Sequence, residues 1–97
     1  MSKKDWRVSI FGAGYVGAVS AGCLAKDGFR VVAVDPDQFK VECLSAGRSP
    51  IYEPGLSELI ETAVESGLLS ATSDYMSAIA ETDISFCCPG TPSREDG

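Results

Sequence analysis

The most informative segment of this chain reads Val8-Ser9-Ile10-Phe11-Gly12-Ala13-Gly14-Tyr15-Val16-Gly17. Its first four residues form a short, largely apolar run, which predicts a buried strand that ends at Gly12. The remainder matches the pattern Gly-x-Gly-x-x-Gly. Alone, this pattern is weak evidence, because small-residue loops often serve only to pack a helix against a strand. Its interpretation therefore depends on the elements that flank it.

A helix is expected over residues 15–26, ended by Gly28. Its larger apolar residues share one face, while alanine and glycine keep the rest small; the larger ones are Val16, Val19, Cys23 and Leu24. A second apolar strand is expected over residues 31–34, ending at Asp35. A continuous apolar run of this kind is typical of a strand buried on both faces, which favours a parallel sheet.

The rest of the chain continues the alternation of helices and strands. Further helices are expected over residues 37–46 and 54–66, and Asp74 can cap a last, brief helix. Strands are expected within residues 68–73 and over residues 84–88. The clearest amphipathic stripe consists of Leu56, Leu59, Ile60, Ala63 and Val64. Strands that alternate with helices predict α/β architecture with right-handed crossovers.

Each glycine of the loop has a distinct physical role in this context. Gly12 permits a tight turn, Gly14 lets the backbone approach a pyrophosphate without an intervening Cβ, and Gly17 lets the helix lie close to the strand. The N-terminus of the helix then offers free N–H groups and a positive dipole end to phosphates. A strand, a glycine loop and a helix in this order predict dinucleotide binding.

Asp35 lies 18 residues after Gly17, at the end of the second predicted strand. A carboxylate in that position can accept hydrogen bonds from the adenosine ribose and would repel a 2′-phosphate. Because Pro36 and Asp37 follow it, rather than arginine, NAD is favoured over NADP. FAD uses the same fingerprint, and spacing alone does not exclude it. The alternative is a glycine turn that serves packing only, with a solvent-facing Asp35.

Two further residues are candidates for contact with the cofactor. Thr91 lies in the exit Gly90-Thr91-Pro92 from the last predicted strand, where its hydroxyl or backbone could touch the cofactor; an ordinary β-turn is the alternative. Lys40 lies on the first turn of the second helix. Composition favours a solvated surface lysine there, and the alternative is a cation that reaches back toward the adenosine side.

The composition of the chain excludes several kinds of binding partner and site. The chain has 97 residues, with 8 basic and 14 acidic side chains and a formal net charge of −6, which argues against nucleic acid or an anionic membrane as partner. The absence of histidine excludes histidine-based metal sites and a histidine base from this chain. No apolar run reaches the ~20 residues of a membrane span, and no signal peptide is recognisable, so a cytoplasmic location is expected.

The chain contains four cysteines, at positions 23, 43, 87 and 88, without C-x-x-C spacing. In a cytoplasmic protein this pattern predicts reduced, buried, small apolar side chains rather than disulfides or zinc ligands.

The sequence resembles the UDP-glucose/GDP-mannose dehydrogenase family. The motifs that carry the resemblance are Gly-Tyr-Val-Gly at 14–17, Glu-Pro-Gly-Leu at 53–56 and Gly-Thr-Pro at 90–92. The resemblance covers nearly the whole chain, from about Arg7 onward. Segments 17–24 and 47–51 look more like the GDP-mannose members than the UDP-glucose members.

Members of this family oxidise the C6 hydroxyl of a nucleotide sugar to a carboxylate with two NAD per turnover. The resemblance implies cofactor roles for Tyr15 and Val16 at the phosphate loop, Asp35 at the ribose, Lys40 near the adenosine, and Thr91 at the strand exit. It also implies a Rossmann-type doubly wound parallel sheet, here incomplete, with about four strands in the order 3-2-1-4. The full-length protein is expected to be a homo-oligomer.

Two departures from the family pattern limit what the resemblance implies. Pro89 stands where the family usually has an aliphatic residue, and proline removes a backbone donor at the strand end. The catalytic motifs of the family have no match in this chain. Residues 1–97 are therefore expected to be the N-terminal part of the NAD-binding domain, inactive alone and without the substrate and dimerisation domains. A non-catalytic dinucleotide-binding module is the alternative of another class.

Overall fold

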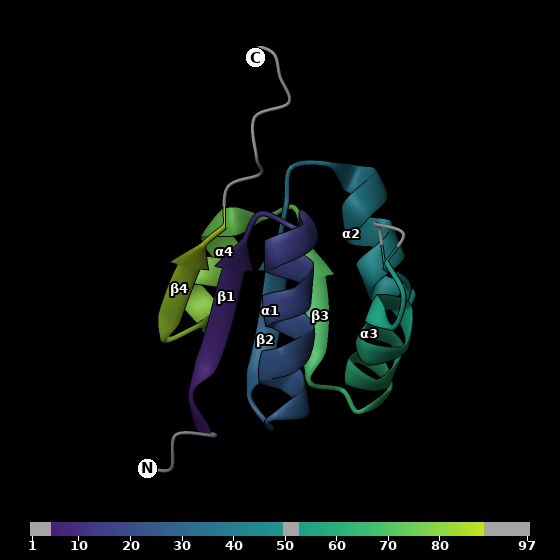
Figure 1. The fold of residues 1–97 in the computed structure, drawn as a ribbon. Helices are drawn as coiled ribbons and strands as arrows, with labels where there is room; N and C mark the ends of the chain where they lie inside the picture. Colours follow the sequence, from purple (N-terminus) through teal and green to yellow (C-terminus); the bar gives the residue numbers. More distant parts are fainter. Residues whose placement is uncertain (1–4, 50–52, 89–97) are drawn as a thin grey trace.

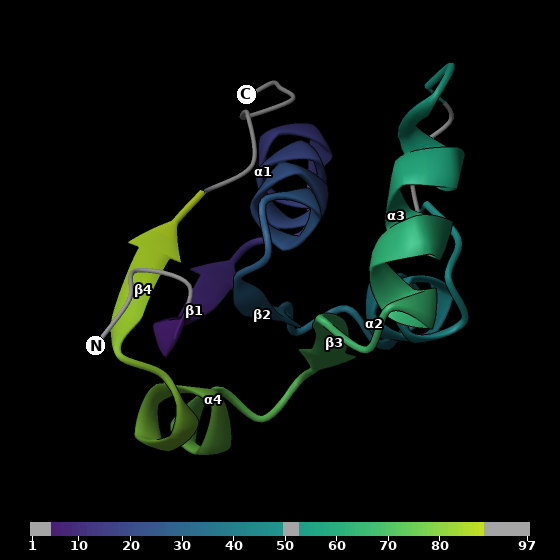
Figure 2. The same cartoon turned by 90° about the horizontal axis from the view of Figure 1, so that it is seen from below.

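The computed structural model describes residues 5–49 and 53–88, which form four parallel strands and four helices. In chain order the elements are β1 (Arg7–Phe11), α1 (Tyr15–Lys26), β2 (Arg30–Val34), α2 (Gln38–Ser45), α3 (Leu56–Glu65), β3 (Leu69–Thr72), α4 (Tyr75–Glu81) and β4 (Ile84–Cys87). The strands form a single sheet in the order β3-β2-β1-β4, as predicted (Figure 1). Viewed from below, α1 and α3 lie on one side of the sheet and α4 on the other (Figure 2).

The sheet register aligns apolar side chains across the strands. Val8 of β1 is paired with Val31 of β2 and with Ile84 of β4, and Val31 is in turn paired with Leu69 of β3. Three of these residues are buried, each with at most 4% of its surface exposed; they are Val8, Val31 and Leu69. The continuous apolar runs of β1 and β2 are thus explained by burial of the two inner strands under helices on both sides.

The predicted helices are confirmed, with small differences at their ends. Asp37 is the N-cap of α2 rather than its first residue, because its side chain accepts a hydrogen bond from the N–H of Phe39 at 2.9 Å. Helix α3 begins at Leu56, with Gly55 as its N-cap. Asp74 caps α4 as expected and accepts from the N–H of Ser77 at 3.1 Å. The amphipathic stripe of α3 faces the core through Leu56, Ile60 and Ala63.

The buried face of α1 is the face made of small residues. Its buried members are Gly17, Ala18, Ala21, Gly22 and Ala25, whereas Val16 is 61% exposed. The close approach of α3 to α1 explains why the small residues are the buried ones. A Cβ at Gly22 would lie 2.7 Å from Cδ2 of Leu59, so that α3 can pack against α1 only where a side chain is missing.

The prediction of four buried cysteines was wrong for most of them. All four are free thiols as predicted, but only Cys43 is buried; Cys23 and Cys87 are exposed, and Cys88 is partly buried. Cys23 lies on the outward face of α1, opposite the small residues, and Cys87 lies on β4 at the edge of the described sheet. In the described parts of the chain, no helix has the length and apolar character of a membrane span.

A hydroxyl cluster around the buried Ser9 joins β1 to the edge strand β4 and to the C-terminal end of α4. Ser9 of β1 has no exposed surface, and its Oγ lies 2.7 Å from Oγ of Ser85 on β4. The same Ser9 oxygen lies 3.0 Å from Oγ1 of Thr82, whose hydroxyl donates to the carbonyl oxygen of Ala78 at 2.8 Å. Buried hydroxyls need such partners, because an unpaired one carries the cost of its lost hydration. The cluster therefore favours the observed register of β1 against β4.

The contact of Gly17 with the preceding loop predicts the effect of a substitution there. A Cβ at Gly17 would lie 1.7 Å from the carbonyl oxygen of Gly12, a backbone atom that cannot move aside alone. We expect Gly17→Ala to lower the free energy of unfolding by more than about 3 kcal/mol, measured by urea denaturation. Gly14→Ala is the matched control, because a Cβ there meets nothing within 4 Å. Equal stability of the two variants would contradict the prediction.

The hydroxyl cluster gives a second prediction for stability. Ser9→Ala removes the hydroxyl that contacts both Ser85 and Thr82, and Thr82 keeps only its bond to the carbonyl oxygen of Ala78. We therefore expect the free energy of unfolding to fall by about 1 kcal/mol in the same measurement. Ser70→Ala on β3 makes the same chemical change at an exposed strand position and should alter stability by less than about 0.5 kcal/mol. A Ser9→Ala variant as stable as Ser70→Ala would show that the cluster contributes nothing.

Candidate functional site

The candidate site lies where the parallel strands end and the glycine loop begins. The N–H of Gly12 donates to the carbonyl oxygen of Val34 at 2.8 Å, so the loop starts directly beside the end of β2. On the other side, the N–H of Cys88 donates to the carbonyl oxygen of Phe11 at 2.7 Å. In Figure 1 the loop crosses from β1 to α1 at the upper edge of the sheet. Ligands of open α/β sheets bind outside this edge.

The geometry of the loop fits the roles expected for its glycines. Gly12 has a φ of 101°, a conformation that favours glycine. Gly14 forms the N-cap of α1, and the space in front of it is open, since a Cβ there would meet no atom within 4 Å. Gly17 faces the carbonyl oxygen of Gly12 with no room for a side chain. The loop therefore turns tightly, leaves one face open and sets α1 against it.

The N-terminus of α1 keeps its hydrogen-bond donors available to a ligand. Gly14 has no side chain with which to cap the helix, and the first turn contains no acidic residue. The unpaired N–H groups and the positive end of the helix dipole therefore face the open space at Gly14. The first two helical residues, Tyr15 and Val16, are 51% and 61% exposed at this end. Their side chains form an apolar surface beside the electropositive backbone at the N-terminus of α1.

Asp35 directly contacts the glycine loop. Its Oδ2 accepts a hydrogen bond from the N–H of Ala13 at 2.7 Å, and its Oδ1 accepts from the N–H of Asp37 at 2.8 Å. The side chain is buried, with 6% of the residue exposed, which contradicts the alternative of a solvent-facing Asp35. The sequence assigned Asp35 and the loop to one cofactor, but it did not predict the direct bond to Ala13, since no feature of the spacing signals it.

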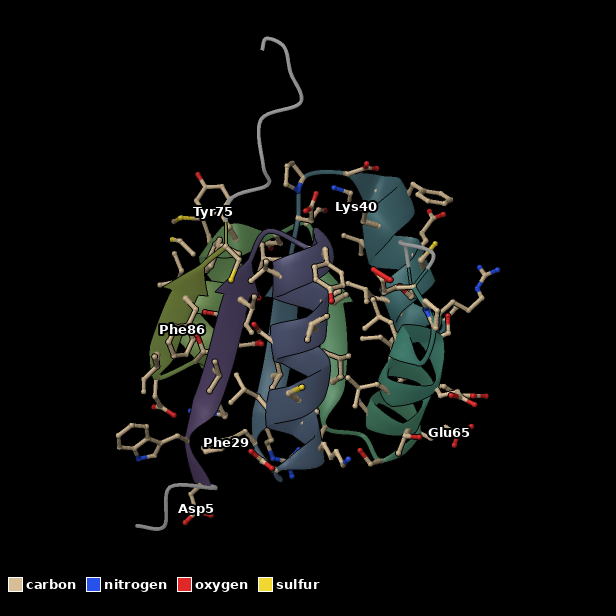
Figure 3. All side chains as sticks on the ribbon, viewed as in Figure 1. Asp5, Phe29, Lys40, Glu65, Tyr75 and Phe86 are labelled. Carbon is tan, nitrogen blue, oxygen red and sulfur yellow. The ribbon has the colours of Figure 1, made fainter. Side chains whose placement is uncertain are left out.

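Lys40 stands apart from this group. Lys40 lies on the first turn of α2, half-buried, at the end of the molecule where β1 and β2 finish (Figure 3). It shares that end with the glycine loop and Asp35, but within the described residues it makes no hydrogen bond or ion pair with them. Thr91 and Pro89 lie outside the described residues. The structure thus brings together the three loop glycines and Asp35.

These groups are chemically complementary to a phosphate that carries a sugar. Backbone N–H groups and a helix dipole attract the anion, and a carboxylate one short turn away accepts hydrogen bonds from hydroxyl groups. No group of three or more potential metal ligands gathers in residues 5–49 and 53–88. The arrangement offers hydrogen-bond donors and an acceptor that can bind and orient such a ligand.

Comparison with known proteins gives one consistent result. Residues 6–97 match the model of the UDP-glucose/GDP-mannose dehydrogenase family, NAD binding domain. The chain is 48% identical over 91 residues to the GDP-mannose 6-dehydrogenase of Pseudomonas aeruginosa, a match that covers 94% of this chain and 21% of that protein. It is 47% identical over 88 residues to the UDP-glucose 6-dehydrogenase of Rhizobium meliloti, covering 91% and 20%.

The structural comparison agrees with the sequence comparison. The crystal structure of a ternary complex of GDP-mannose dehydrogenase from Pseudomonas aeruginosa matches with a TM-score of 0.87 at 48% identity, covering 94% of this chain and 21% of that one. The chain thus spans about a fifth of the length of these relatives. On the evidence of its glycine loop, its sheet order and these similarities, the chain belongs to the UDP-glucose/GDP-mannose dehydrogenase family and corresponds to its NAD-binding domain.

Proposed function

We propose that this chain binds NAD as the cofactor-binding part of a nucleotide-sugar 6-dehydrogenase. The observation that carries the proposal is the open glycine loop hydrogen-bonded to a buried acid, with Asp35 Oδ2 at 2.7 Å from the backbone nitrogen of Ala13. Together these groups provide donors for a pyrophosphate and an acceptor for a ribose within one short segment. Family membership makes NAD the cofactor to which this geometry corresponds.

Each residue of the site has a distinct part in holding the cofactor. The first N–H groups of α1 donate to the pyrophosphate, and Gly14 allows it to approach the backbone closely. Tyr15 and Val16, which are exposed at the same end of the helix, contact the cofactor beside the phosphate loop. Asp35 accepts from the adenosine ribose. Lys40 extends toward the adenosine side, and Thr91 contributes from the segment after β4.

Charge favours NAD over NADP. Asp35 directly follows β2 beside the loop, and Asp37 follows two residues later as the cap of α2. A 2′-phosphate in this region would meet two carboxylates and no arginine from residues 35–37, which costs binding free energy through like-charge repulsion.

The reaction of the full-length protein would be a four-electron oxidation. NAD, when bound, accepts a hydride in each of two steps, so that a C6 alcohol and one water become a carboxylate, two NADH and three protons. This chain binds and orients the cofactor and supplies no catalytic residue, and the rest of the protein would provide the catalytic groups and the oligomer interface. As part of such a full-length enzyme it would act in the cytoplasm.

GDP-mannose, oxidised to GDP-mannuronate, is the substrate we propose. Segments 17–24 and 47–51 resemble the GDP-mannose members of the family more than the UDP-glucose members. Overall identity favours neither strongly, at 48% for a GDP-mannose 6-dehydrogenase and 47% for a UDP-glucose 6-dehydrogenase. UDP-glucose, oxidised to UDP-glucuronate, is therefore the second candidate.

Cofactor binding is tested by calorimetric titration of the protein with NAD and with NADP. We expect NAD to bind and NADP to bind more than about tenfold more weakly, equivalent to about 1.4 kcal/mol. Gly14→Ala should weaken NAD binding by at least a similar factor without loss of stability, since its Cβ would occupy the open space at the loop.

Two results would contradict this proposal. Equal affinity for NAD and NADP would remove the assigned role of the carboxylates in cofactor choice. Unchanged NAD affinity of Gly14→Ala would show that the cofactor does not approach the loop at Gly14.

The substrate is tested with the full-length protein that contains this segment. We expect NADH formation, followed at its absorbance maximum, with GDP-mannose and less than about one tenth of that rate with UDP-glucose, at matched concentrations. Residues 1–97 alone should form no NADH with either sugar. Faster turnover of UDP-glucose would make UDP-glucose the substrate. Turnover by residues 1–97 alone would contradict the proposal that the rest of the protein provides the catalytic groups.

A further inference from the structure

The Asp35 carboxylate makes two backbone hydrogen bonds before any ligand is considered. Oδ2 accepts from the N–H of Ala13 in the glycine loop, and Oδ1 accepts from the N–H of Asp37 in the turn between β2 and α2, at 2.7 and 2.8 Å. The backbone N–H of Asp35 itself donates to the carbonyl oxygen of Thr72 at the end of β3, at 3.2 Å. One residue therefore joins three segments at the upper edge of the sheet.

The burial of Asp35 makes these hydrogen bonds important for stabilising its charge. Only 6% of the residue is exposed, so its charge is poorly hydrated and is compensated by the N–H groups that it accepts. Charge-assisted hydrogen bonds of this kind are stronger than neutral ones. The loop residue that it holds, Ala13, lies between Gly12 and Gly14, where the backbone would otherwise have wide conformational freedom.

We propose that Asp35 is a positioning residue that holds the glycine loop in the shape that receives the pyrophosphate, independently of any contact with the ribose. The proposal deepens the proposed NAD binding and rests on it. A loop that is already ordered loses less conformational entropy when the ligand binds, so affinity for the pyrophosphate itself depends on the carboxylate.

Positioning and ribose binding are compatible in one side chain. A carboxylate has about four acceptor positions on its two oxygens, and the two backbone N–H groups occupy two of them. The remaining positions are free to accept ribose hydroxyl groups. The two roles differ in the ligand atoms on which they depend, which makes them separable by experiment.

The test compares ADP with 2′,3′-dideoxy-ADP, which keeps the adenine and the pyrophosphate but lacks both ribose hydroxyl groups. We expect Asp35→Ala to weaken binding of both ligands by about tenfold or more, because both backbone bonds are lost in either case. Asp74→Asn is the matched control. It removes the same charge at an exposed position and keeps a side chain that caps α4, so it should change the affinity for the dideoxy ligand by less than about threefold.

Hydrogen exchange of the Ala13 amide, measured by NMR without ligand, tests the contact itself. We expect this amide to be protected in the protein and in Asp74→Asn, and to exchange at least about tenfold faster in Asp35→Ala. If Asp35→Ala did not fold, the measurement on the unmodified protein would still decide, because an unprotected Ala13 amide there would overturn the proposal.

The outcomes separate this inference from the proposed function. If Asp35→Ala weakened ADP alone and left 2′,3′-dideoxy-ADP unchanged, Asp35 would act only through the ribose, and the positioning role would be overturned. If the unmodified protein bound neither NAD nor ADP, the proposed function would fail, and so would the role in receiving the pyrophosphate. A protected Ala13 amide would then leave only the structural contact standing.

Discussion

At Gly17 the first helix lies so close to the preceding loop that a single carbon atom has no place between them. A Cβ there would lie 1.7 Å from the carbonyl oxygen of Gly12. This contact fixes where α1 starts relative to β1, and the short connection through Gly14 then directs the N-terminus of the helix at the edge of the sheet. The small residues along α1 extend the same close approach to the sheet and to α3.

The close packing of α1 leaves the polar groups of the loop to be satisfied by a partner outside β1. Asp35 is that partner, and its burial is tolerated because both oxygens accept backbone N–H groups. The result is an edge with donors at α1 and acceptors at Asp35, held together without any ligand. Such an edge is already ordered, which lowers the conformational entropy that binding of a ligand would cost.

Most of the fold could be predicted from the sequence, because its signals are local. Apolar runs, capping residues such as Asp74, and the glycine pattern each concern a few neighbouring residues. The site was predicted less completely. The bond from Ala13 to Asp35 joins residues 22 positions apart, and the Ser9 cluster joins β1 to residues more than 70 positions away. The exposure of Cys23 and Cys87 likewise depends on which faces other elements cover.

Local chemistry along the chain was sufficient to predict the alternation of strands and helices, the glycine loop and the acid that follows β2. Backbone conformation and periodicity are properties of short segments, which is why these features could be predicted. Whether an apolar residue is buried, and which oxygen accepts which N–H, follows instead from how separate segments meet in space. Val16 is exposed because α1 turns its small residues toward the sheet, and Asp35 is enclosed because the loop closes over it. Such contacts depend on packing distances between elements, which spacing along a single chain does not contain.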